Sequence, residues 1–361
     1  MAWERCKTSQ PRGNSATTKN NMGLLSFFNK ELAMDLGTAN SIVIFNDQVV
    51  VDEPSIVAID VPTNKVIAVG REAKLMEGKN NPNIRTIRPL KGGVIADFKM
   101  AQHLIRELIK MANVSRSFMP PALRMVICIP SGITDVEVRA VRESAEQAGA
   151  KEIKMIQEPM AAAIGIGIDV LQPYGNMIVD IGGGTAEVAV ISLGGIVCSQ
   201  SVKTAGDEFN NNVIEYMRKQ HNIHIGVRTA EKVKIAVGSA VSELENPPED
   251  FLTRGLDLLT GLPKTILVNY KEIAHALDKS ITYIESAILE TLSNTPPELA
   301  ADIYDNGIYL AGGGSLLRGL DQRISSKTKL KVHIAEDPLR AVARGTGIAL
   351  KNFNKFSFLI R

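Results

Sequence analysis

Two aspartates that each precede a glycine-rich turn are the residues of this sequence whose spacing most directly suggests chemistry. Asp35 ends an apolar run before the turn Gly37–Asn40, and Asp180 ends another before the turn Gly182–Thr185. Tight turns with small side chains expose backbone N–H groups to an anion, and a threonine in each turn adds a hydroxyl donor. If the two turns face each other, they would hold a polyphosphate from both sides.

The same two aspartates suggest a metal site. Mg²⁺ prefers oxygen ligands and keeps several of its waters, so carboxylates on both sides of a phosphate would hold it largely through those waters. An aspartate in this position can instead cap its own turn. Because Asp35 and Asp180 occupy equivalent places in two similar segments, we favour a magnesium site.

Two further features belong to the same chemistry. The cluster Gly312, Gly313, Gly314 and Ser315 follows an apolar run, and a helix start there would offer free N–H groups to a phosphate, or a cradle to a sugar and base. Glu158 precedes Pro159, a residue suited to the first turn of a helix. A carboxylate held rigidly at that place would orient the water that attacks a γ-phosphate, or would simply cap the helix.

The elements that must position these residues occur twice. Residues 32–50 and 177–197 each contain an apolar strand ending in Asp, a glycine-rich turn, an alternating strand and a second turn. We expect the second turns at Asn46-Asp47 and Gly194-Gly195. The repeat predicts a duplicated fold in which each half opens with a β-hairpin.

Strands and helices follow each hairpin. Residues 125–129 form a continuous apolar run typical of a buried strand, and a helix is expected after the capping box of Thr134 and Glu137. A second strand is expected at 307–311. The order predicts an α/β fold with mixed sheets and helices on both faces.

Composition narrows the class of protein. The 361 residues are 45% hydrophobic and 22% charged with a net charge of +2, which suits a globular protein and does not indicate a nucleic-acid partner. Three widely spaced cysteines indicate neither a zinc site nor a disulfide framework and fit a reducing cytoplasm. No apolar run approaches the length of a membrane-spanning helix, and the polar N-terminus lacks the apolar core of a secretion signal.

Several stretches together resemble the MreB family, the bacterial homologues of actin within the actin, Hsp70 and sugar-kinase superfamily. The resemblance covers the chain from about residue 30 to its end. Its most specific motifs are MDLGTAN (34–40), EPMAAAIG (158–165), VDIGGGTAEVAVISLGG (179–195) and LAGGGSLLRGLD (310–321).

The resemblance implies an actin-like ATPase fold of two related RNase H-like domains, each with a smaller inserted subdomain. It divides the chain into an N-terminal extension, 1–30, disordered and ending in a short amphipathic membrane segment; subdomain IA, 31–61 and 95–170 with 341–361 returning to it; IB, 62–94; IIA, 171–206 and 276–340; and IIB, 207–275.

The resemblance also assigns the site. It implies that ATP and Mg²⁺ bind between the halves and that Glu158 positions the hydrolytic water. Asp35 and Asp180 would serve the metal. The nucleotide would be bound by Thr38, Ala39, Asn40, Gly182, Gly183, Gly184, Thr185, Glu231, Lys232, Val233, Lys234, Gly312, Gly313, Gly314 and Ser315. By its charge pattern alone, the segment 231–234 is typical of a solvated helix face.

Filament formation is implied only by the resemblance. MreB-like proteins form paired antiparallel protofilaments on the inner face of the cell membrane, where they organise peptidoglycan synthesis and maintain rod shape with partners such as RodZ and MreC. Membrane contact is expected at Leu24, Leu25, Phe27, Phe28, Phe118 and Met119. The alternative is an ATPase or kinase of the same superfamily that forms no filament, similar to Hsp70 or a sugar kinase.

Overall fold

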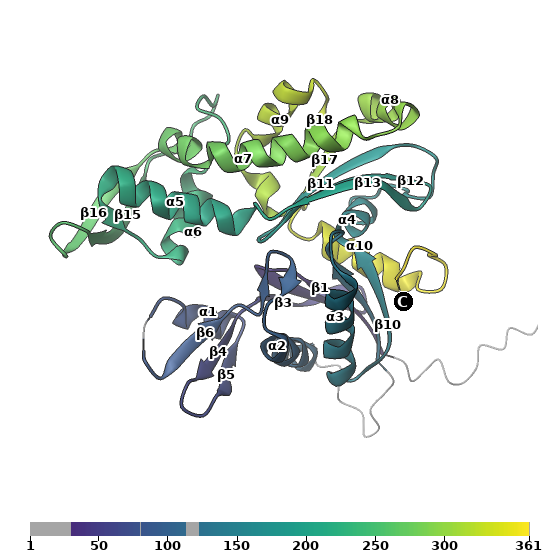
Figure 1. The fold of residues 1–361 in the computed structure, drawn as a ribbon, viewed down its shortest axis with the longest axis horizontal. Helices are drawn as coiled ribbons and strands as arrows, with labels where there is room; N and C mark the ends of the chain where they lie inside the picture. Colours follow the sequence, from purple (N-terminus) through teal and green to yellow (C-terminus); the bar gives the residue numbers. More distant parts are fainter. Residues whose placement is uncertain (1–29, 80, 113–122, 361) are drawn as a thin grey trace, which may run out of the picture.

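The computed structural model describes residues 30–79, 81–112 and 123–360. Two five-stranded sheets form the centre of the molecule, one in each half, and helices cover them (Figure 1). The first sheet has the order β10–β9–β1–β2–β3 and the second β13–β12–β11–β17–β18. The α/β fold expected from the sequence is confirmed.

The two sheets repeat one topology. The first contains β1 (Lys30–Leu36), β2 (Asn40–Phe45), β3 (Gln48–Pro54), β9 (Leu123–Ile129) and β10 (Ala150–Gln157). The second contains β11 (Asn176–Ile181), β12 (Ala186–Ser192), β13 (Gly195–Val202), β17 (Ile308–Ala311) and β18 (Val332–Ile334). In each, the first three strands pair antiparallel and the last two continue the sheet in parallel. The duplication inferred from the hairpins therefore extends to whole sheets.

The outer turns of the two hairpins have the same geometry. Asn46 and Asp47 have φ values of 50° and 63°, and Leu193 and Gly194 have 50° and 70°, as a two-residue turn between antiparallel strands requires. The second turn lies one residue before the predicted Gly194-Gly195, because Gly195 already pairs with Ser192 in the ladder. Leu193 tolerates its strained φ where its N–H donates to the carbonyl of Gln172.

Helices follow the strands as the local sequence predicts. α2 (Phe98–Met111) begins at Asp97, which caps it through the N–H of Met100. α3 (Asp135–Gln147) carries the predicted capping box, in which Thr134 accepts from the N–H of Glu137 and the Glu137 carboxylate accepts from that of Thr134. The remaining helices are α1 (Arg71–Met76), α4 (Glu158–Gly165), α5 (Gly206–His221), α6 (Val227–Val237), α7 (Tyr270–Ser293), α8 (Pro297–Asn306), α9 (Leu320–Thr328) and α10 (Ala341–Lys351).

α4 and α10 cross in close contact at a pair of glycines. A Cβ on Gly165 would lie 1.8 Å from the carbonyl oxygen of Ala341, and a Cβ on Gly345 would lie 1.8 Å from that of Ala161. The contacts are reciprocal, since each helix presents an Ala-x-x-x-Gly stretch to the other. The backbones meet directly here, and no side chain fits between them.

Two inserted segments extend beyond the sheets on the same side of the molecule (Figure 1). The first holds the sheet β5–β4–β6, from β4 (Val57–Asp60), β5 (Lys65–Val69) and β6 (Ile84–Ile87), and a short ribbon, β7 (Leu90–Lys91) with β8 (Val94–Ile95). The second holds β14 (Ile223–His224), β15 (Phe251–Asp257) and β16 (Pro263–Val268), beside α5 and α6. The subdomain boundaries stay predictions.

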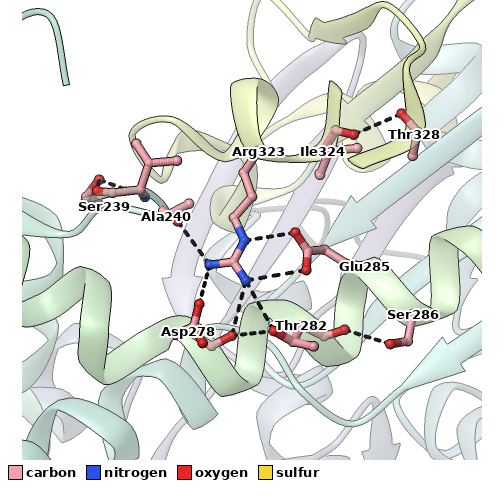
Figure 2. A network of polar contacts seen from close by, with 10 residues as sticks. Ser239, Ala240, Asp278, Thr282, Glu285, Ser286, Arg323, Ile324 and Thr328 are labelled. Atoms are coloured by element: carbon pink, nitrogen blue, oxygen red, sulfur yellow. Dashed lines mark hydrogen bonds and ion pairs between the residues drawn. The ribbon is translucent and has the colours of Figure 1, made fainter. Parts of the chain in front are cut away.

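A half-buried arginine secures the helices of the second half, as Figure 2 shows. The guanidinium of Arg323 on α9 donates to Glu285 of α7 at 2.8 Å and to Asp278 at 2.8 Å. It also donates to the carbonyl of Ala240 at 3.1 Å, in the segment that follows α6. The network fixes the end of α6 relative to α7 and α9.

Candidate functional site

A cavity of about 650 Å³ lies between the two halves. The inner turns of both hairpins line it, together with the start of α5, one face of α6 and the residues after β17 and β18. Of the residues predicted from the sequence, it brings together Asp35, Thr38, Ala39, Asn40, Glu158, Asp180, Gly182, Gly183, Gly184, Thr185, Glu231, Lys234, Gly312, Gly313 and Gly314.

The two inner turns face each other closely, as their use as a phosphate clamp requires. A Cβ on Gly183 would lie 2.6 Å from the Cβ of Ala39, and one on Gly184 would lie 2.6 Å from the Thr38 hydroxyl. The N–H of Gly93 donates to that hydroxyl at 3.0 Å. The glycines of the second turn therefore leave room for the side chains of the first.

Asp35 and Asp180 are placed by their strands. Asp35 lies near the end of β1 opposite Ile42, and Asp180 near the end of β11 opposite Glu187. Oδ1 of Asp180 is buried and has no hydrogen-bond partner among the described residues, and a Cβ on Gly312 would lie 2.4 Å from it. Gly312 thus keeps the space beside this oxygen open.

The site concentrates acidic groups in a region of little solvent. Burial raises the pKa of Asp35 to about 7. Burial, and then the charges of Asp35 and Glu187, raise the pKa of Asp180 to about 8. Burial, and then the charges of Asp180, Glu187 and Asp35, raise the pKa of Glu158 well above its usual range. A cation bound among these groups would offset both effects.

The residues fit a magnesium ion that the protein binds with few direct ligands. Within residues 30–79, 81–112 and 123–360, no group of three or more His, Cys, Asp or Glu side chains is arranged to hold a metal. Two aspartates and the unpartnered Oδ1 of Asp180 suit an ion that takes its remaining ligands from phosphate and water.

α6 contributes one face of its helix to the cavity. Glu231 and Lys234 line it, whereas Lys232 is exposed on another side and Val233 is fully buried in the core. Lys234 donates to the carbonyl of Gly206 at 3.0 Å, and burial lowers the pKa of its ammonium. Helical geometry explains the division, because residues three apart share a face and their neighbours do not.

The third glycine cluster differs from its predicted form. Gly313–Leu316 make one 3₁₀ turn, and α9 begins only at Leu320, so the cluster is not the start of an α-helix. Gly312 has a φ of 76°, which ends β17 sharply, and a Cβ on Gly314 would collide with the Ile181 side chain at 2.2 Å. Ser315 is fully buried and its hydroxyl donates to the carbonyl of Gly312 at 2.7 Å, so it does not line the cavity.

Glu187 is a buried acid at the site that the sequence analysis missed. It is fully buried on β12, and its carboxylate accepts from the hydroxyls of Ser131 and Ser201, the latter at 2.5 Å. Ser131 follows β9 of the first half, so this carboxylate joins the two halves behind the inner turns. Alternation in this segment is typical of a half-buried strand, but every residue of β12 is buried.

One ion pair crosses from one inserted segment to the other. Lys74 of α1 lies 3.0 Å from Glu231 of α6, and both side chains are about one-third exposed, at 29% and 35%. Glu231 also lines the cavity. The pair therefore links the two halves at the edge of the site.

Comparison with known proteins identifies the family. Residues 29–358 match the family model described as MreB/Mbl protein. The chain belongs to the MreB/Mbl family. It is 46% identical over 329 residues to the cell shape-determining protein Mbl of Bacillus subtilis (strain 168), covering 91% of this chain and 98% of that protein. It is 47% identical over 334 residues to the cell shape-determining protein MreB of Escherichia coli (strain K12), covering 90% and 94%.

Solved structures agree with the MreB/Mbl assignment. The structure of MreB5 of Spiroplasma citri bound to AMPPNP is similar at a TM-score of 0.85 and 39% identity, covering 91% of this chain and 97% of that one. The ADP complex of the same protein is similar at a TM-score of 0.86. The predicted actin-like fold is confirmed.

The residues of this MreB/Mbl chain that are predicted to contact the membrane fall on segments that the structure does not describe. Leu24, Leu25, Phe27, Phe28, Phe118 and Met119 lie outside the described residues. Among the helices in the described part of the chain, none is both long and apolar enough to cross a bilayer.

Proposed function

We propose that this protein binds ATP with Mg²⁺ between its two halves and assembles with copies of itself into cytoskeletal filaments that determine cell shape. The observation that carries the proposal is the pair of duplicated inner turns, which face each other across a cavity that holds Asp35 and Asp180. Membership of a family whose named relatives determine cell shape supports the role in the cell.

The inner turns are assigned to the phosphates. Their backbone N–H groups and the hydroxyls of Thr38 and Thr185 are the donors that line the cavity from opposite sides. α5 begins at Gly206 beside the second turn, where the N–H of Asp207 donates to the carbonyl of Gly183 at 2.7 Å. The ammonium of Lys234 and the carboxylate of Glu231 suit the ribose side.

Asp35 and Asp180 would hold the magnesium ion, largely through its waters. When bound, the ion supplies positive charge that stabilises the phosphate oxygens. The protein's part is to keep both carboxylates in place at the strand ends, and the absence of a side chain at Gly312 leaves room for Oδ1 of Asp180.

Glu158 is assigned to the attacking water. It is the first residue of α4, and Pro159 and the crossing with α10 hold this helix rigidly. A carboxylate with a raised pKa accepts a proton more readily than an ordinary one, which suits a residue that orients and deprotonates water. Hydrolysis here would be slow and coupled to assembly.

The finer features of the cellular role rest on the family resemblance. They are paired antiparallel protofilaments, attachment to the inner face of the cell membrane, organisation of peptidoglycan synthesis, and contact with partners such as RodZ and MreC. A short apolar segment binds a membrane weakly by itself, and a filament would multiply that attachment through avidity.

Sedimentation with nucleotide tests the proposal. The purified protein is expected to pellet with ATP and Mg²⁺ and to stay in solution when EDTA replaces Mg²⁺. Electron microscopy of the pellet should show filaments. A protein that stays monomeric with ATP and Mg²⁺ while phosphorylating a small acceptor would instead support the kinase alternative and overturn the filament proposal.

A further inference from the structure

A groove lies away from the proposed nucleotide cavity, between β5 and α2. It measures about 910 Å³ and is lined by Lys65–Val69 of β5 and by one side of α2, with Glu53, Arg71 and Glu72 also contributing. Figure 1 shows β5 at the margin of its small sheet, with α2 beyond it. None of its lining residues lines the proposed nucleotide site, so the groove is separate from that site.

One wall of this groove is the free edge of a strand. β5 is the outermost strand of the β5–β4–β6 sheet and pairs only with β4 among the described strands. Lys65 and Ile67 are exposed on it, the latter at 45%. Backbone N–H and C=O groups along such an edge accept an additional strand, which is how several protein modules bind extended peptides.

The opposite wall carries a stripe of basic side chains. Lys99, His103, Arg106 and Lys110 recur every three or four residues along α2 and all line the groove. Lys110 pairs with Glu107 at 2.6 Å, whereas Lys99 and Arg106 form no ion pair with any described residue. Across the gap, Lys65 is likewise unpaired within the described part.

The charge of the groove points to an acidic occupant. Five lysines and arginines line it against three glutamates, and of these glutamates Glu53 and Glu107 already face Arg71 and Lys110. Placing carboxylates opposite Lys65, Lys99 and Arg106 would balance the unpaired cations. A flat anionic membrane would reach the rim of a concave groove but would not pair with the edge of β5.

We propose that the groove between β5 and α2 binds an acidic, extended peptide segment of a partner protein. The segment adds as a strand to the free edge of β5, and its carboxylates contact Lys99 and Arg106 of α2. Main-chain hydrogen bonds provide part of the affinity, and the charges select acidic sequences.

Fluorescence anisotropy with a labelled peptide tests this proposal on the nucleotide-free protein. The probe alternates aspartate with valine, and the comparison peptide alternates lysine with valine. The acidic probe is expected to bind, and the basic one is not. An acidic probe methylated at its backbone nitrogens should bind at least about tenfold more weakly, because it cannot donate to the strand edge.

Charge reversal on the face of α2 that lines the groove provides a second test of the proposal. Lys99→Glu with Arg106→Glu should weaken the acidic probe at least about tenfold. The matched control, Lys327→Glu with Lys331→Glu, changes two exposed lysines outside the groove and should leave binding unchanged. Circular dichroism establishes that both variants are folded.

Three results would overturn the proposal: no binding of the acidic probe, equal binding of the methylated probe, or unchanged binding by the α2 variant. Vesicles of phosphatidylglycerol and a single-stranded oligonucleotide are measured with the same proteins. If the α2 variant loses affinity only for one of these, the groove recognises a membrane or nucleic acid rather than a peptide.

Discussion

The inner turns of the two hairpins occupy equivalent positions in the two halves, but they differ in the side chains that they carry. Gly37, Thr38 and Ala39 of the first correspond to Gly182, Gly183 and Gly184 of the second. The second turn has glycine where the first has side chains, and the hydroxyl of Thr38 and the methyl of Ala39 occupy that space. A duplicated fold can thus build one site from two copies only after the copies diverge.

The strands that follow the inner turns also differ in the side chains that they place opposite the two aspartates. Opposite Asp35 the first half places Ile42, whereas opposite Asp180 the second half places the buried carboxylate of Glu187. The second half therefore carries more of the site's charge, and the first contributes Glu158 from α4. The crossing of α4 with α10, by contrast, is symmetric, with Gly165 and Gly345 in reciprocal contacts.

The largest effect is expected on stability, from substitutions of the two glycines where α4 crosses α10. Gly165→Ala and Gly345→Ala each drive a methyl group into a backbone carbonyl of the other helix, so each should reduce the free energy of unfolding by at least about 3 kcal/mol. Chemical denaturation measures both. Gly195→Ala, whose Cβ would meet only Ser192 at 3.7 Å, should cost much less. Markedly unequal losses would show that the crossing is not symmetric.

The pH dependence of stability distinguishes the contribution of Asp35 from that of Asp180. Both have pKa values near 4 when unfolded, and about 7 for Asp35 and about 8 for Asp180 when folded. The folded protein therefore binds more protons over this range, so their contribution is fully present below pH about 4 and is lost as the pH rises through 7 and 8.

Thermal denaturation without nucleotide or metal should accordingly show a melting temperature that falls from pH 5 to pH 8.5, with a loss of stability on the order of a few kcal/mol. Asp35→Asn should reduce the slope only up to about pH 7, whereas Asp180→Asn should reduce it up to about pH 8. Glu298→Gln, at an exposed position, serves as the control. A slope that neither aspartate changes would contradict the assigned pKa values.

Glu158→Ala should slow ATP hydrolysis more than about tenfold, equivalent to about 1.4 kcal/mol, and leave ATP binding near its original affinity. The reason is that Glu158 is assigned to the water rather than to the phosphates. Phosphate release and nucleotide titration measure the two quantities separately. Unchanged turnover would remove Glu158 from the reaction and leave Glu187 as the stronger candidate among the buried acids.

The smallest effect is expected at the ion pair between the inserted segments. Lys74→Ala removes a partly exposed pair worth less than about 1 kcal/mol, so nucleotide release should accelerate by less than about fivefold. Lys79→Ala, an exposed lysine near α1, is the control. Stopped-flow release of a fluorescent nucleotide measures both variants. A release rate that Lys74→Ala leaves unchanged would mean that the ion pair does not hold the two inserted segments together over the nucleotide.

The sequence predicts the duplicated hairpins because Asp, Gly and apolar alternation are local signals. It does not predict that Glu187 is buried, since that depends on whether a second layer covers the outer face of β12. Lys232 and Val233 do not line the cavity. Helical spacing alone could have predicted this from the sequence. The Ala-x-x-x-Gly stretches of α4 and α10 are visible too, but only the fold shows that they meet.

The phosphate clamp itself is tested most directly by the affinity for ATP and Mg²⁺ of Gly184→Ala, measured by isothermal titration calorimetry. The added methyl lies 2.6 Å from the Thr38 hydroxyl and 2.9 Å from the backbone nitrogen of Gly92, so it forces the two turns apart. We predict binding at least about tenfold weaker than that of the unaltered protein, in a variant that stays folded without nucleotide. A folded variant that binds ATP and Mg²⁺ as tightly as the original would contradict the assignment of the facing turns to the phosphates.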